Sequence, residues 1–172
     1  MYKSNEIMQI AYVVDDLDAA IERWRSLIDT GPFFVFRDSS PEIFKYRGQQ
    51  SEVRLDIAIG QVGPVQVEFV QPKMAGPNIW RDGVAAGAQG FHHQCYVTDD
   101  LQAEIARYAQ MGVELGVEAQ AGPIAFAYFD TRHLIGSMTE VVQRCEAFDG
   151  LCKMIADAAV DWDGSDPVRV LG

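Results

Sequence analysis

The sequence has no long hydrophobic run and few cysteines. No stretch approaches the roughly 18 apolar residues of a membrane-spanning helix, and residues 1–6 lack the apolar core of a signal peptide. The three cysteines, Cys95, Cys145 and Cys152, are an odd number without the spacing of a disulfide framework. We therefore expect free thiols, a cytoplasmic location and no membrane partner.

Basic residues are also scarce. The chain has 14 Lys and Arg residues against 25 Asp and Glu residues, which gives a formal net charge of −11. A surface of this sign repels the phosphates of nucleic acids, so we expect no nucleic acid partner. With 172 residues, 48% of them hydrophobic, residues 1–172 are expected to form a single domain.

The most informative feature is a segment that occurs twice. Residues 9–24 return, after a shift of 84 residues, as residues 93–108, and eight of the sixteen positions are identical. Two copies are too few for a solenoid of stacked repeats. We therefore expect the two copies to pack against each other as halves of one domain.

Each copy begins a similar series of predicted elements. Asp16 and Asp100 each precede an apolar pattern of helical period, and Asp is a favoured residue at the N-terminal cap of a helix. In the first copy we expect strands near residues 7–14, 33–36, 53–59 and 65–70, and a helix at 17–28. In the second copy we expect strands near 92–98, 114–118, 124–130 and 137–143, and a helix at 101–111.

These elements predict an α+β fold made of two βαβββ modules. The modules comprise residues 6–72 and 90–143, and residues 73–89 connect them. We expect one eight-stranded, cup-shaped mixed sheet with the two module helices on its outer face. Residues 39–50 are interpreted as a polar excursion or lid, and the tail of residues 144–172 should carry a helix near 147–159.

Four polar residues occupy matching positions within the predicted strands. His93 takes the place of Gln9 in the repeat, and Glu68 and Glu140 occupy equivalent positions in the last strand of each module. Glu and Gln are otherwise poor choices for the middle of a strand. His93 could be a core histidine, the two glutamates could lie on a rim, and Gln9 could serve only as a hydrogen-bonding residue. The matched positions favour convergence of all four on one site.

Other candidate residues have simpler interpretations. The pairs Asp15–Asp16 and Asp99–Asp100 could suggest a metal, but helix capping explains both, and we prefer it. His92 is interpreted as a neighbour that packs toward the helices or the rim. His133 lies in a predicted turn and should be exposed.

Three residues are candidates for substrate binding. Phe36 and Trp80 could equally be core residues or the wall of a pocket. If Leu55 and its alternate neighbours pack on helices, Arg54 faces the cavity, where it could orient an anionic group. The alternative for Arg54 is a salt bridge with Asp56 or with a glutamate.

Two such modules, with Gln or His in each first strand and Glu in each last strand, resemble the vicinal oxygen chelate superfamily over about residues 6–143. In its metal-dependent members, the four corresponding residues hold one divalent ion, which implies Gln9, Glu68, His93 and Glu140 as ligands. This order is similar to that of zinc-type glyoxalase I, whereas methylmalonyl-CoA epimerase usually has His, Gln, His and Glu. The lack of a second His ligand disfavours the iron chemistry of extradiol dioxygenases. Val13, which replaces an arginine that receives glutathione, disfavours glutathione adducts.

The resemblance implies a metal-dependent glyoxalase-like lyase, isomerase or epimerase. It would act on a small oxygen-chelating substrate by acidifying a C–H bond next to a carbonyl, with Glu140 or Glu68 moving the proton. The donor set permits Zn, Mn, Co, Ni or Mg. The alternative is a metal-free protein that binds or sequesters an aromatic or hydrophobic compound, as bleomycin-resistance relatives do. Relatives often pair, so a homodimer is expected.

Overall fold

The structure is a computed structural model that describes residues 2–4 and 6–171. Its first module contains β1 (Ile7–Val13), α1 (Leu17–Ile28), β2 (Phe33–Ser39), β5 (Leu55–Val62) and β6 (Val65–Pro72). Its second contains β7 (Gly90–Thr98), α3 (Leu101–Gln110), β8 (Leu115–Ala121), β9 (Ile124–Phe129) and β10 (Met138–Gln143). Outside the two modules' repeated order lie β3 (Ile43–Tyr46), β4 (Gln49–Gln50), α2 (Ile79–Gly83), α4 (Arg132–Ile135), α5 (Glu146–Ala159) and β11 (Val168–Leu171). The predicted α+β fold with its repeated βαβββ order is confirmed.

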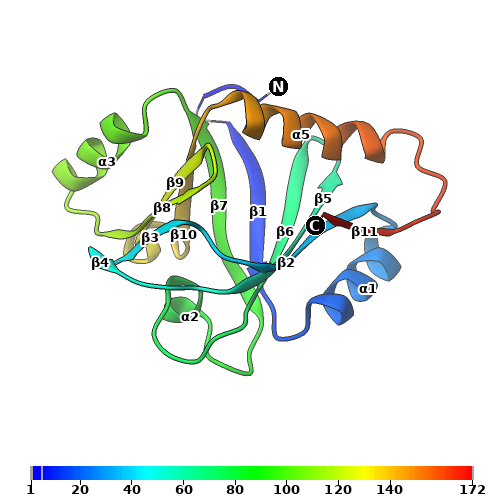
Figure 1. Cartoon of the computed structure of the whole chain (residues 1–172), viewed down its shortest axis with the longest axis horizontal. Helices are drawn as coiled ribbons and strands as arrows, with labels where there is room; N and C mark the ends of the chain where they lie inside the picture. Colours follow the sequence, from blue (N-terminus) through cyan, green and yellow to red (C-terminus); the bar gives the residue numbers. More distant parts are fainter. Residues whose placement is uncertain (1, 5, 172) are drawn as a thin grey trace.

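One sheet runs through both modules, in the strand order β11-β2-β5-β6-β1-β7-β10-β9-β8-β3-β4. Its centre is the antiparallel pair of β1 and β7, the first strand of each module (Figure 1). The eight predicted strands are present, but the sheet has eleven strands among the residues that the structure describes. The tail supplies β11, which pairs with β2, and the excursion supplies β3 and β4, which extend the sheet from β8. Residues 43–46 and 49–50 are therefore part of the sheet, a correction to the interpretation of residues 39–50 as a polar excursion or lid.

The excursion also brings the two ends of the sheet together. Strands β2 and β3 lie near opposite ends of the strand order, yet only residues 40–42 separate them in the chain. So short a link spans at most roughly 14 Å. The sheet therefore has to curve around one of its faces, as the cup-shaped prediction requires.

The helices α1 and α3 begin where the sequence predicted. The side chains of Asp16 and Asp100 each accept a hydrogen bond, at 2.9 Å, from the backbone N–H of the residue three positions on. Gln71 and Gln143, near the end of the last strand of each module, accept from the first N–H of the same two helices. Capping is confirmed for Asp16 and Asp100, and the same side-chain cap recurs in both modules. Asp15 and Asp99 do not cap; their side chains pair with Arg81 and Arg144.

The two faces of the sheet carry different helices. One face, here called the outer face, packs against α1 and α3 through two separate apolar clusters. The inner face carries Glu68, His93 and Glu140, and α5 lies across one end of it, packed through Cys152 and Ile155. Figure 1 shows α5 along the upper side of the sheet and α2 below it.

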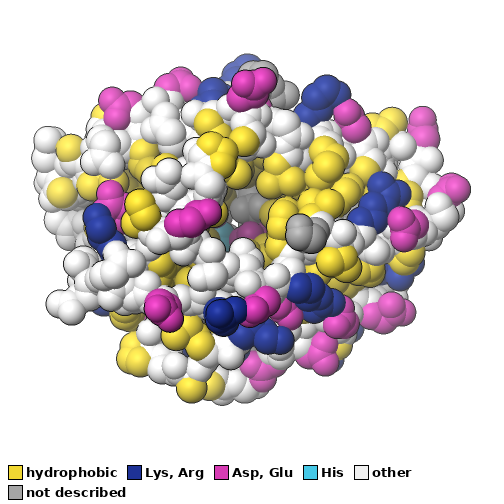
Figure 2. Space-filling view, in the orientation of Figure 1, with side chains coloured by type: hydrophobic (Ala, Val, Ile, Leu, Met, Phe, Trp, Pro, Cys, Tyr) yellow, Lys and Arg dark blue, Asp and Glu magenta, His cyan; other side chains and the backbone are white. Residues whose placement is uncertain are grey.

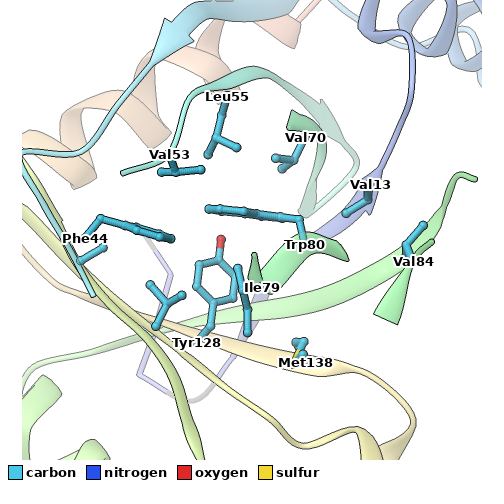
Figure 3. Close-up of a cluster of buried hydrophobic side chains, with 12 residues drawn as sticks. Val13, Phe44, Val53, Leu55, Val70, Ile79, Trp80, Val84, Tyr128 and Met138 are labelled. Carbon is cyan, nitrogen blue, oxygen red and sulfur yellow. The ribbon is translucent and has the colours of Figure 1, made fainter. Parts of the chain in front are cut away.

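The other end of the inner face is covered by Trp80 of α2. Its ring stacks on Phe44 of β3 at a centroid distance of 5.9 Å and meets the Tyr128 ring edge-on at 5.7 Å. Figure 3 shows Trp80 in the middle of this cluster, with Val53, Leu55 and Val70 on one side and Tyr128 on the other. The carboxylates and the histidine thus lie between two apolar clusters, one around Trp80 and one beneath α5.

Two further expectations concerned membrane-spanning helices and disulfide bonds. Within the described residues, no helix is long and apolar enough to cross a membrane. Cys95, Cys145 and Cys152 are all free thiols, as predicted.

Candidate metal centre

Three of the four predicted ligands meet on the inner face of the sheet. Glu68 comes from β6, His93 from β7 and Glu140 from β10, and one potential ligand atom from each lies within 4.8 Å of the other two. The Nε2 atom of His93 is 3.1 Å from Oε2 of Glu140 and 3.4 Å from Oε2 of Glu68. Carboxylates from two different modules therefore face the same ring nitrogen.

Strand register explains the convergence. Ala11 of β1 pairs with Glu68 on one side and with His93 on the other, so a small residue separates the two polar ones. Glu140 pairs with Cys95, two residues after His93 and on the same face of β7. Because Ala11 and Cys95 have short side chains, the longer ones can bend over them and meet.

The cluster is almost shut off from solvent. His93 is 0% exposed, Glu140 7% and Glu68 8%. Burial raises the pKa of the Glu68 carboxyl, and although His93 acts against this, the charge of Glu140 raises it further. Burial also disfavours the His93 cation, but Glu140 and Glu68 outweigh that effect and raise the pKa of His93 to about 9. Two buried carboxylates therefore need a positive charge between them.

The donor set fits a divalent cation. Oε2 of Glu68 is buried and has no hydrogen-bond partner within the described residues, because the one Nε2 of His93 bonds to Glu140. Two carboxylates would balance the charge of a divalent ion, and a neutral imidazole would add a nitrogen ligand. Such an ion would also satisfy the free oxygen of Glu68.

Gln9, the fourth predicted ligand, lies on the same face one row away. It is 6% exposed, and its Cα pairs with those of Gln66 and Cys95. Its amide nitrogen is 3.4 Å from the amide oxygen of Gln66. The amide of Gln9 thus bonds to Gln66 and not to a member of the three-residue cluster, and its role as a ligand stays a prediction.

Two neighbours of the cluster were not assigned a role in it from the sequence. His92 contacts His93 through their Nδ1 atoms, 2.9 Å apart, and burial, assisted by the His93 charge, lowers the pKa of His92 to about 3. The Tyr128 ring lies edge-on to the His93 ring at 4.9 Å, and burial raises the pKa of its hydroxyl well above the usual 10. Tyr128 pairs with Glu140 in the β9–β10 register, and that pairing is the signal that could have identified it.

The three residues predicted to bind substrate lie in different places. Trp80 is 2% exposed and covers one end of the inner face. Phe36 is partly buried against Ile155 of α5, also on the inner face.

Arg54 does not reach the inner face, a correction to its prediction. Its side chain is 63% exposed and forms an ion pair with Asp38. The alternative of a salt bridge is met in kind but with a different partner, because Asp56 pairs with Arg37 and Lys73. Leu55 and its alternate neighbours do pack on helices, as the prediction for Arg54 assumed, but those helices, α2 and α5, lie on the inner face. Leu55 packs against Trp80 on the inner face, so its neighbours along the strand point outward.

Figure 2 shows a hollow near the middle of the molecule, with acidic and histidine atoms visible at its floor. Apolar side chains surround much of its rim (Figure 2). This opening is where a small molecule could approach the polar inner face.

The sequence pattern of the Glyoxalase/Bleomycin resistance protein/Dioxygenase superfamily matches residues 8–128. The chain belongs to this superfamily. The match extends from the first strand of one module to Tyr128 in the other, and it confirms the predicted resemblance. Among curated proteins, none matches the chain.

Solved structures share the fold. A Streptomyces coelicolor methylmalonyl-CoA epimerase variant has 18% identity and a TM-score of 0.56, over 83% of this chain and 99% of its own. The Mycobacterium tuberculosis epimerase has 15% identity and a TM-score of 0.57, over 87% and 94%. A hypothetical protein from Bacillus halodurans has 15% identity and a TM-score of 0.59, over 84% and 97%. At these identities the similarity is one of fold.

Proposed function

We propose that this protein is a metal-dependent isomerase, epimerase or lyase that acts on a small oxygen-chelating substrate. The observation that carries the proposal is the buried convergence of Glu68, His93 and Glu140. A charged cluster of this kind is costly in a protein interior unless a cation compensates it. Glu68, His93 and Glu140 would hold the ion, with Gln9 as a fourth ligand.

A divalent ion bound there would supply Lewis acidity toward a substrate carbonyl, which makes the neighbouring C–H bond easier to ionise. The carboxylate of Glu140 or Glu68 would take the proton from that carbon and return it to the same or an adjacent position. Tyr128, as a neutral phenol beside the carboxylates, can donate a hydrogen bond to a substrate oxygen. The apolar clusters around Trp80 and beneath α5 limit the access of water, which strengthens electrostatic interactions with the substrate.

The substrate class is a small carbonyl compound with a second oxygen close to the first. Structures with the same fold hold CoA thioesters, among them an epimerase in complex with methylmalonyl-CoA. Methylmalonyl-CoA is therefore the first compound to test, followed by 2-oxo and 2-hydroxy acids and their thioesters. Glutathione adducts come last, because Val13 lies where an arginine would receive them.

The experiment follows the exchange of the proton next to the carbonyl. Protein loaded with Zn²⁺, Mn²⁺, Co²⁺, Ni²⁺ or Mg²⁺ is incubated with each compound in D₂O, and deuterium incorporation is measured by NMR. We expect exchange with at least one compound, dependent on the metal and abolished by EDTA. Exchange that persists without any ion would contradict the proposed mechanism.

A metal-free binding protein for aromatic or hydrophobic compounds is the alternative. Such a protein has no use for two carboxylates buried against one histidine, so the cluster favours the enzyme. The homodimer and the cytoplasmic location remain parts of the proposal, and sedimentation equilibrium would test the first of them.

A further inference from the structure

His92 holds the ring nitrogen of His93 that the carboxylates do not contact. The Nδ1 atoms of the two rings are 2.9 Å apart, and Nε2 of His92 is 2.9 Å from the backbone carbonyl oxygen of Ile79. Nε2 of His93, at the other end of its ring, faces Glu140 and Glu68. A continuous chain of contacts therefore runs from α2 through two imidazoles to the candidate metal centre.

The partners determine where the hydrogens lie along this chain. A carbonyl oxygen can only accept, so Nε2 of His92 must carry a hydrogen. Nδ1 of His92 could carry a second hydrogen only if the ring were a cation, and a buried cation needs an acidic partner. Within the described residues, His92 hydrogen-bonds only to Ile79 and His93. Nδ1 of His92 is therefore the acceptor, and Nδ1 of His93 donates to it.

We propose that His92 is a positioning residue that presents His93 to the metal ion through Nε2. By accepting from Nδ1 of His93, it fixes both the tautomer and the orientation of that ring. The Nε2 lone pair is then directed to the point where Glu68 and Glu140 converge. This inference rests on the proposed metal-dependent function and adds a residue to it.

The series of contacts ends at the Ile79 carbonyl, and this end is held firmly in place. Ile79 and the following Trp80 are almost fully buried in the apolar cluster that covers the inner face. The Ile79 carbonyl therefore holds His92 rigidly, since α2 cannot shift without displacing the stacked Trp80 ring. His92 therefore links the position of α2, whose Trp80 covers the site, to the orientation of the His93 ring.

Loss of such a supporting hydrogen bond typically weakens metal binding by roughly 10–100-fold. His92→Phe keeps a ring of similar size but has neither donor nor acceptor, so we expect its Zn²⁺ affinity to fall by about that factor. His92→Asn keeps an acceptor oxygen as many bonds from Cα as Nδ1 is, so its affinity should remain near that of the parent. His133→Phe makes the same change at an exposed histidine and should have no effect.

The experiment combines Zn²⁺ titration calorimetry on these variants with ¹⁵N NMR of the zinc-loaded, histidine-labelled parent. We expect His93 to show a metal-bound Nε2 and a protonated Nδ1. A zinc-bound Nδ1, or a folded His92→Phe that binds Zn²⁺ as tightly as the parent, would overturn the inference. If His92→Phe does not fold, weak zinc binding by a folded His92→Asn overturns it instead. A parent protein that takes up no Zn²⁺ refutes the proposed function itself, a separate and recognisable result.

Discussion

Glu68 and Glu140 approach the same nitrogen of His93, at 3.4 and 3.1 Å, from the last strands of two different modules. The internal repeat places them at matching positions, and the sheet brings those positions together across β1 and β7. Two carboxylates this close repel each other in a dry interior. A cation bound between the two carboxylates therefore stabilises this arrangement.

Glu140→Gln should lower turnover far more than stability. Gln keeps the size and one oxygen of the side chain but cannot act as a base, so kcat should fall by roughly 10²–10⁴-fold. The folded protein should lose little stability, because the change also relieves the repulsion with Glu68. Kinetics on the substrate found by deuterium exchange, together with urea unfolding, would measure both effects.

The matched control is Glu22→Gln on the exposed face of α1, where the side chain pairs with Arg25 in a surface ion pair. It should leave both measurements unchanged. Full activity of Glu140→Gln would show that this carboxylate does not carry the proton.

The stability of the metal-free protein should depend on pH through His93. Its pKa is raised to about 9 in the folded state, from an ordinary value of 6.5. A raised pKa stabilises the folded state fully below about pH 6.5, and the contribution is lost as the pH rises through 9. The raised pKa of Glu68 acts in the same direction.

In excess EDTA, urea unfolding at a series of pH values should therefore show a falling free energy of unfolding between about pH 6.5 and 9. His93→Gln should flatten that part of the curve, whereas His133→Gln, at an exposed site, should not. An unchanged slope in His93→Gln would mean that His93 is not protonated in the metal-free protein.

The repeat carried most of what could be predicted from the sequence. Positions that match between the copies, such as Glu68 and Glu140, must lie at equivalent places in two similar modules. Once the modules share a sheet, equivalent places on their inner strands become neighbours. The caps at Asp16 and Asp100 followed from local chemistry, which tertiary contacts did not override.

The features that were missed depend on contacts far apart in the chain. Strands β3 and β11 have four residues each, too few for a clear alternation, and they exist because a sheet edge is available to pair with. Arg54 was assigned to the wrong face because α5, a tail helix outside the repeat, packs on the inner face. Alternation along a strand tells which residues share a face, but not which of the two faces is the site.

Arg54→Ala should leave metal binding and turnover unchanged. Its exposed side chain pairs with Asp38, and a surface ion pair of this kind contributes at most about 1 kcal/mol to stability. Steady-state kinetics would show KM and kcat at parental values. A marked rise in KM would mean that the side chain moves to the substrate when it binds.

The most direct test of the central claim is the metal content of protein purified without a metal-affinity tag. We predict about one equivalent of a divalent ion per chain, or its uptake on titration, measured by elemental mass spectrometry. His93→Ala removes the nitrogen ligand and should abolish tight binding, and Glu68→Gln should weaken it, while His133→Ala should retain the parental content. A parent protein that neither carries nor takes up an ion, or a His93→Ala variant with a full equivalent bound, would contradict the account.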